Sequence, residues 1–219
     1  ELLMEFPPYE DDIEKGEKLW NTPFKNGKTY ASCFQNGGKG LAVGYPFYDK
    51  DSKKMRTIEA DINECRVRNG EEPIKNLNHG EMAQLVIAFK RLSQGQKMAV
   101  KLNSPEAVAA YEKGKQFYWA RRGQLNFSCA NCHVQNAGNK IRGDVLSAAL
   151  GHGTGFPVYR TKWAQSNKPL GTIHRRYGGC NKQVRAAALK PQSDSYVALE
   201  LYQAYMNTGI PIKVPSQRQ

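Results

Sequence analysis

Apolar residues recur at helical spacing in three segments of the chain. In residues 80–98 they stand three or four positions apart, at Met82, Leu85, Val86, Phe89 and Leu92. A second segment opens on Ser104-Pro105-Glu106, where a hydroxyl cap, a proline and an acid favour a helix start, and it ends near Gly123. The third follows Ser193-Asp194, with apolar positions at Tyr196, Val197, Leu199, Leu201 and Tyr205. The pattern predicts a mainly α-helical protein whose methionine and aromatic side chains form the core.

The two halves of the sequence share landmarks in the same order, as a duplicated domain would. Three segments match: 27–33 with 123–129, 44–48 with 155–159, and Cys65 with Cys180. We therefore expect two tandem domains of one fold, at residues 1–102 and 103–219. Each domain is expected to close with a helix that packs on its first helix.

The second half contains the motif C-x-x-C-H at residues 129–133. This motif attaches a c-type haem, because two cysteines on one helical turn reach the two vinyl groups at one porphyrin edge. The histidine that follows then lies over the ring face, where its imidazole binds iron. A redox-active or zinc-binding C-x-x-C is the alternative reading. The amphipathic helix before Cys129, however, is typical of c-type cytochrome domains. We expect one covalent haem c on Cys129, Cys132 and His133.

The first half lacks this motif. Asn36 and Gly37 stand where the second attachment cysteine and the iron ligand would be, so this cytochrome c-like domain is expected to have lost its haem. Cys33 and Cys65 would then face each other across the emptied pocket. Haem c is attached outside the cytoplasm, which implies a periplasmic protein, and in such an oxidising compartment two facing thiols form a disulfide.

These assignments leave a fifth cysteine, Cys180, without a partner. We expect it to bind the haem iron as a thiolate, opposite His133. An inert buried thiol is the simpler alternative. Other side chains with suitable atoms compete for the same position: His152, His174, Met98 and Met206. Met206 fits a helical core better, His152 is held as a weak alternative, and His79 is expected to be structural.

Three arginines, Arg175, Arg176 and Arg185, flank Cys180. They can pair with haem propionates, which the planar guanidinium does well. Alternatively they form an anion site that lowers the pKa of the cysteine and attracts an anionic substrate. The sequence does not divide the arginines between these two roles.

The composition is that of a globular protein with a strong positive charge. Hydrophobic residues make up 40% and charged residues 24% of the 219 residues, and the formal net charge is +12. This charge favours an anionic protein or small anion as partner. A nucleic-acid partner is not expected, because the lysines and arginines are spread along the chain. No apolar run is long enough for a membrane span, and we expect any export signal to have been removed.

Taken together, the pattern resembles the A subunit of the SoxAX cytochromes of sulfur-oxidising bacteria, over nearly the whole chain. The resemblance rests on the paired domains, on the motif at residues 129–133, on the block 176–181 (RYGGCN) with Arg185 behind it, and on Cys33 and Cys65 in place of a first haem. Because Asn36 and Gly37 remove the first site, the chain looks like the single-haem type.

The resemblance implies an enzyme, an L-cysteine S-thiosulfotransferase. It would join thiosulfate to a cysteine of the SoxYZ carrier protein and pass two electrons through haem to a cytochrome acceptor. Cys180 would be both the iron ligand and the sulfur at which the chemistry occurs. Arg176 would hold the sulfonate of thiosulfate, with Arg185 as a second candidate. A small c-type cytochrome, the X subunit, would complete a heterodimer.

Two other functions compete with this reading. In a plain electron-transfer cytochrome, Cys180 would be structural and Met206 or His152 would bind iron. In a haem-based sensor, the sixth position on the iron would be open or labile.

Overall fold

The chain folds into helices joined by short strands and single turns. The computed structural model describes residues 7–141 and 143–218. The first half contains α2 (Glu10–Asn21), η1 (Tyr30–Cys33), η2 (Gln35–Gly38), η3 (Leu41–Gly44), β1 (Phe47–Asp49), β2 (Lys54–Arg56), α3 (Ile58–Arg68) and α4 (Glu81–Arg91). The second half contains α5 (Pro105–Trp119), η4 (Asn131–Gln135), β3 (Lys140–Ile141), β4 (Asp144–Val145), η5 (Gly153–Gly155), β5 (Val158–Arg160), α6 (Thr161–Ala164), β6 (Leu170–Gly171), α7 (Ile173–Gln183), α8 (Asp194–Met206) and β7 (Ser216–Arg218). The prediction of a mainly helical protein is confirmed.

The helix starts follow local capping chemistry. Ser104 caps α5, because its hydroxyl accepts a hydrogen bond from the backbone N–H of Ala107 at 3.1 Å, and Pro105 takes the first helical position. Thr57 caps α3 in the same way. Ser193 stands at the start of α8 as predicted, but its side chain makes no capping hydrogen bond.

Helix α4 is shorter than the sequence pattern predicted. It ends at Arg91, whereas the prediction carried the helix to Met98. The chain turns at Gly95, which has a φ of 77°. Residues 95–98 then pair with the C-terminal segment, since Gly95 N–H donates to Ile212 O and Met98 N–H donates to Ile210 O. A partner far along the chain, which periodicity does not reveal, thus ends this helix.

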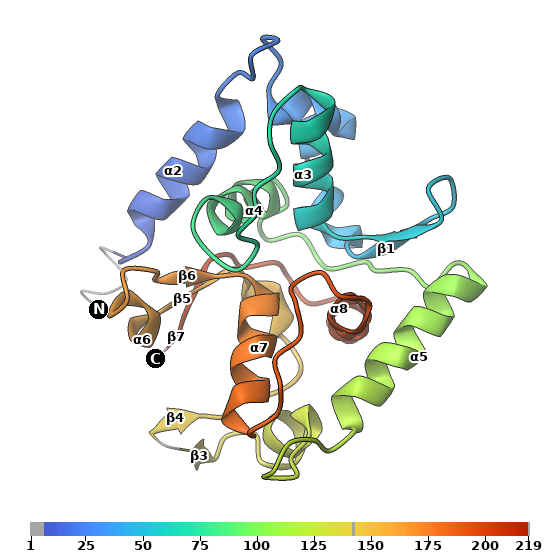
Figure 1. Ribbon diagram of the computed structural model, residues 1–219, viewed down its shortest axis with the longest axis vertical. Helices are drawn as coiled ribbons and strands as arrows, with labels where there is room; N and C mark the ends of the chain where they lie inside the picture. Colours follow the sequence, from blue (N-terminus) through green and yellow to red (C-terminus); the bar gives the residue numbers. More distant parts are fainter. Residues whose placement is uncertain (1–6, 142, 219) are drawn as a thin grey trace.

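In each half, the first helix packs on the last one. Helix α2 lies against α4, and α5 lies against α8 (Figure 1). A glycine permits each close approach: a Cβ on Gly16 would lie 2.3 Å from Gln84 O, and a Cβ on Gly114 would lie 2.0 Å from Ala198 O. The expected packing of closing helices on opening helices is therefore present in both halves.

A three-stranded sheet, in the order β6-β5-β7, pairs the last strand of the chain with two strands that precede α7. Strands β5 and β7 run parallel, which places Arg160 opposite Arg218. The hairpins β1-β2 and β3-β4 are separate two-stranded sheets. Within the described ranges, no helix combines the length and the apolar character that crossing a bilayer requires.

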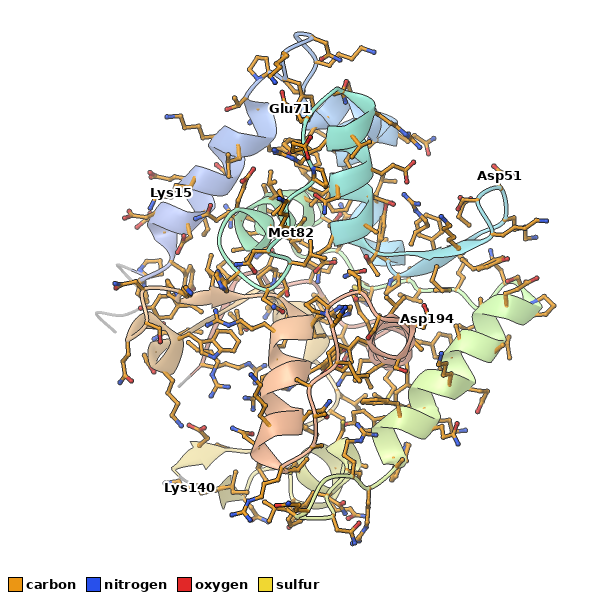
Figure 2. The ribbon with its side chains drawn as sticks, in the orientation of Figure 1. Lys15, Asp51, Glu71, Met82, Lys140 and Asp194 are labelled. Atoms are coloured by element: carbon orange, nitrogen blue, oxygen red, sulfur yellow. A yellow bond between two sulfur atoms is a disulfide. The ribbon has the colours of Figure 1, made fainter. Side chains whose placement is uncertain are left out.

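Each half has its own hydrophobic core, and α8 contributes to both. The first core is rich in aromatic rings that contact one another, among them Trp20, Tyr30, Phe34 and Phe89. Figure 2 shows Met82 inside this half, whereas Lys15 projects from its periphery. The predicted disulfide between Cys33 and Cys65 is present.

Candidate functional site

The C-x-x-C-H segment begins at a tightly bonded turn after α5. Ser128 and Asn131 cap each other: the Ser128 N–H donates to Asn131 Oδ1 at 2.8 Å, and the Asn131 N–H donates to Ser128 Oγ at 3.1 Å. This reciprocal pair fixes the first turn, on which Cys129 and Cys132 stand. Both sulfurs are outside any disulfide, and both residues line one large cavity with His133.

The imidazole of His133 is oriented by a loop after β4. Its Nδ1 lies 2.7 Å from the backbone carbonyl oxygen of Ser147, so Nδ1 carries the proton and donates it. Nε2 is then left with a lone pair, which is the form that binds a metal.

Helix α7 brings Cys180 to the opposite part of the site. The Tyr177 hydroxyl donates to Gln203 Oε1 on α8 at 2.5 Å, and the Asn181 amide donates to the Tyr196 hydroxyl at 2.9 Å. These two bonds hold the buried side of α7 against α8. The Cys180 side chain lines the cavity and contacts the side chain of His133.

The cavity has a volume of about 530 Å³, which is a usual size for a cofactor or ligand pocket. One part of its wall is basic and combines Arg160 and Arg218 from the sheet with Arg176 from α7. Asp144 lies 3.4 Å from Arg160 and 2.8 Å from Lys162. Burial lowers the pKa of Arg160 and of Arg218, and the charge of Arg176 lowers both further. An anion bound here would relieve this repulsion.

The same charges act on the thiol of Cys180. Burial raises the pKa of this thiol, but the positive charge of Arg176 and the contact with His133 outweigh burial. The pKa of Cys180 therefore lies below its usual value, whereas burial raises the pKa of Cys129 to about 12. Cys180 is thus the thiol in this cavity that most readily becomes a thiolate.

The other sequence candidates for an iron ligand lie elsewhere. Met98 is in the first core, and Met206 packs at the edge of the second core outside the cavity wall. The Nε2 of His174 lies 3.0 Å from Glu200 on α8, outside the cavity wall. His152 does line the cavity, but its ring packs directly against the ring of His133, with 4.7 Å between the ring centres. It therefore does not lie across the cavity from His133.

The three arginines predicted to flank Cys180 lie in different surroundings. Arg176 lines the cavity one helical turn before Cys180. Arg185 does not: α7 ends at Gln183, and Arg185 is exposed with a φ of 58°. Arg175 packs its guanidinium on the ring of Trp163 at 3.9 Å and donates to backbone carbonyls.

Sequence reasoning missed Arg160 and Arg218 as cavity residues. No spacing reveals them, since the parallel pairing of β5 with β7 brings them together. Arg122 was missed as well, although it stands shortly before the haem motif. Its guanidinium packs on Phe117, and one of its nitrogens is buried without a hydrogen-bond partner among the described residues.

These residues fit a c-type haem. Two thiols on one turn could attach its vinyl groups, and the His133 imidazole and the Cys180 thiol in the same cavity could bind its iron. Arg122 Nη1 and Arg218 Nε are buried and lack hydrogen-bond partners in the described part of the chain, so an anionic group in the cavity would satisfy them.

The comparisons with known proteins agree with one another. A sequence model described as SoxA/TsdA, cytochrome c domain, matches residues 15–98. The L-cysteine S-thiosulfotransferase subunit SoxA of Chlorobaculum tepidum is 46% identical over 99% of this chain and 74% of its own length. The chain belongs to the SoxA family. The subunit of the same name from Allochromatium vinosum is 45% identical over the whole of this chain and 76% of its own length.

A solved structure extends the family relationship to three dimensions. A chain in the crystal structure of SoxXA from P. pantotrophus superimposes with a TM-score of 0.84 at 35% identity, over 95% of this chain and 78% of that one. The fold is therefore the helical, cytochrome c-like fold of the SoxA family. The matched cytochrome c domain, residues 15–98, is the half of the chain that lacks the C-x-x-C-H motif.

Proposed function

We propose that this SoxA family member is the haem-bearing subunit of an L-cysteine S-thiosulfotransferase, the activity for which its relatives are named. One observation carries the proposal: the Cys180 thiol lines the cavity within reach of both His133 and the Arg176 charge. A plain electron carrier needs neither a polarised thiol nor an arginine cluster at that place. Met206, the alternative iron ligand of an electron carrier, does not line the cavity.

The reaction forms a sulfur–sulfur bond. The terminal sulfur of thiosulfate joins a cysteine sulfur of a carrier protein, the carrier thiol loses its proton, and two electrons pass to a cytochrome acceptor. A bound haem would supply one-electron oxidation, which is why a second haem-bearing partner is expected. Arg176 would hold the sulfonate through its planar fork, and Cys180 would hold its sulfur against the reacting sulfurs.

The cofactor would be one covalent haem c. Cys129 and Cys132 would hold the haem through thioether bonds, and His133 and Cys180 would bind its iron. The partners would be a small SoxX-type cytochrome c, a SoxYZ-type carrier and thiosulfate. A heterodimer is supported by the SoxXA complex that contains the similar chain. Attachment of haem c outside the cytoplasm supports a periplasmic location.

The two halves, residues 1–102 and 103–219, would be duplicated cytochrome c-like domains, of which the first has lost its haem. Two similarities support the duplication. Each half orders a single turn, a strand and a cysteine-bearing helix in the same way: η3, β1 and α3 in one, η5, β5 and α7 in the other. Each opening helix crosses the closing one at a glycine, Gly16 or Gly114. Aromatic rings and the Cys33–Cys65 disulfide would replace the first haem.

Substitution of Cys180 tests the enzyme reading. In Cys180→Ala and Cys180→Ser, thiosulfate-dependent turnover with the carrier should be lost, while the mass of the chain should still include one haem. Lys113→Ala, an exposed change on α5, is the matched control and should keep full turnover. Full turnover in Cys180→Ala would refute the proposal that Cys180 takes part in the reaction.

The same variants identify the iron ligand. Electron paramagnetic resonance of the ferric protein should show thiolate ligation that disappears in Cys180→Ala. A histidine–methionine signature in the unaltered protein would instead favour the electron carrier.

A further inference from the structure

His152 is a buried histidine of the cavity wall to which the proposed reaction gives no role. Only 6% of its surface is exposed. Its ring packs against the ring of His133, with 4.7 Å between centres and 62° between planes. The ring also lies near Phe156, with 5.6 Å between ring centres. His152 therefore touches the proposed iron ligand without being placed to bind the iron itself.

One residue, Ser147, joins the two histidines. Its backbone carbonyl accepts the hydrogen bond from His133 Nδ1 at 2.7 Å. Its side-chain hydroxyl is hydrogen-bonded to His152 Nδ1 at 2.6 Å. The loop is closed by a further bond, since the Ala149 N–H donates to His133 O at 2.8 Å.

The loop that carries His152 is anchored on the far side as well. The Gly151 N–H donates to Asn207 Oδ1 at 2.6 Å, and Asn207 is fully buried just after α8. The Thr154 hydroxyl donates to Gly151 O at 3.0 Å. These bonds hold the backbone around His152 in place. The bond from His152 to the Ser147 hydroxyl therefore also restrains the position of the Ser147 carbonyl.

We propose that His152 is a positioning residue for His133, which it orients through Ser147. The bond to the Ser147 hydroxyl keeps the Ser147 carbonyl in line with Nδ1 of His133, and the packed ring limits rotation of the His133 imidazole. Nε2 of His133 is thereby aimed into the cavity. The inference rests on the proposed function only in that His133 binds the haem iron.

The hydrogen bond to Nδ1 also sets the electronic character of the ligand. A carbonyl that accepts strongly from Nδ1 makes the imidazole a better donor, which stabilises the oxidised metal. Loosening Ser147 should therefore shift the haem equilibrium toward the reduced form. We expect a change of up to about tenfold in that equilibrium, which for one electron corresponds to 59 mV.

Three variants of the haem-loaded heterodimer test this role without thiosulfate or carrier. His152→Phe keeps a ring but removes the bond to Ser147, and Ser147→Ala removes the hydroxyl while leaving the carbonyl. Both should raise the midpoint potential and alter the electron paramagnetic resonance g values. His152→Asn, whose amide can still bond the Ser147 hydroxyl, should restore most of the original potential. His79→Phe, in the other half, is the control and should change neither quantity.

A double variant separates positioning from general loosening of the fold. If His152 acts through Ser147, the pair His152→Phe with Ser147→Ala should shift the potential no more than the larger single change. Unchanged potential and g values in the folded single variants would overturn the proposal, and so would additive shifts. Loss of imidazole ligation from the unaltered protein would instead refute the proposed site. Loss of turnover alone bears on the proposed function only.

Discussion

The crossing of α5 with α8 gives the most direct test of the packing that builds the site. Gly114→Ala adds a Cβ that would lie 2.0 Å from Ala198 O and 2.5 Å from Ala198 C. Since Cβ contacts below 3.0 Å are essentially never seen, the helices must separate by about 1 Å or more. Forcing backbone apart in a packed core costs about 3 kcal/mol, while alanine returns about 1 kcal/mol of helix propensity. The net loss of stability should be about 2 kcal/mol.

Thermal unfolding of the haem-loaded protein measures this loss. For a chain of this length, about 2 kcal/mol corresponds to a fall in Tm of roughly 4–8 °C. Gly179→Ala on α7 is the matched control, because its added Cβ would meet no atom within 4 Å beyond its own stretch of helix. The control should gain about 1 kcal/mol from helix propensity. If Gly114→Ala were as stable as the control, the close approach of α5 and α8 would be wrong.

Three further outcomes are expected. Glu59 is buried and its pKa is raised to about 7 by burial and by Glu200, so the folded state binds this proton more tightly than the unfolded state. The stability that protonation of Glu59 contributes is complete below pH 4.5 and is lost as the pH rises toward 7. Glu59→Gln should therefore reduce the difference in unfolding free energy between pH 5 and pH 8, measured by urea unfolding. An unchanged difference would contradict this expectation. Replacing both Cys33 and Cys65 by alanine should cost about 3 kcal/mol in urea unfolding, and no loss would mean that this bridge is not stabilising. Turnover with an acidic carrier should fall as salt rises from about 0.05 to 0.3 M, whereas a flat response would exclude electrostatic steering.

Local chemistry in the sequence is strong enough to predict several parts of this protein. The C-x-x-C-H motif defines its own geometry, because all of its donors lie within one turn. The cap at Ser104 fixes the start of α5 for the same reason. The disulfide between Cys33 and Cys65 follows from comparing the two halves. A further signal was available: Glu-Lys-Gly recurs at residues 14–16 and 112–114, at the two helix crossings.

Other features depend on contacts between segments that are distant in the sequence. Helix α4 stops early because residues 95–98 pair with residues 210–212. Arg185 looks equivalent to Arg176 along the chain, yet α7 ends between them and only Arg176 reaches the cavity.

Residue type and short spacing therefore predict which side chains can act as donors at the proposed site, whereas contacts between distant segments set what surrounds them. Donor identity is a property of residue type and short spacing, which every conformation of the chain retains. The basic wall of Arg160 and Arg218 exists only because two strands far apart in the chain run side by side. The same holds for His152, a possible ligand in the sequence, which the fold places beside His133 and bonds to Ser147.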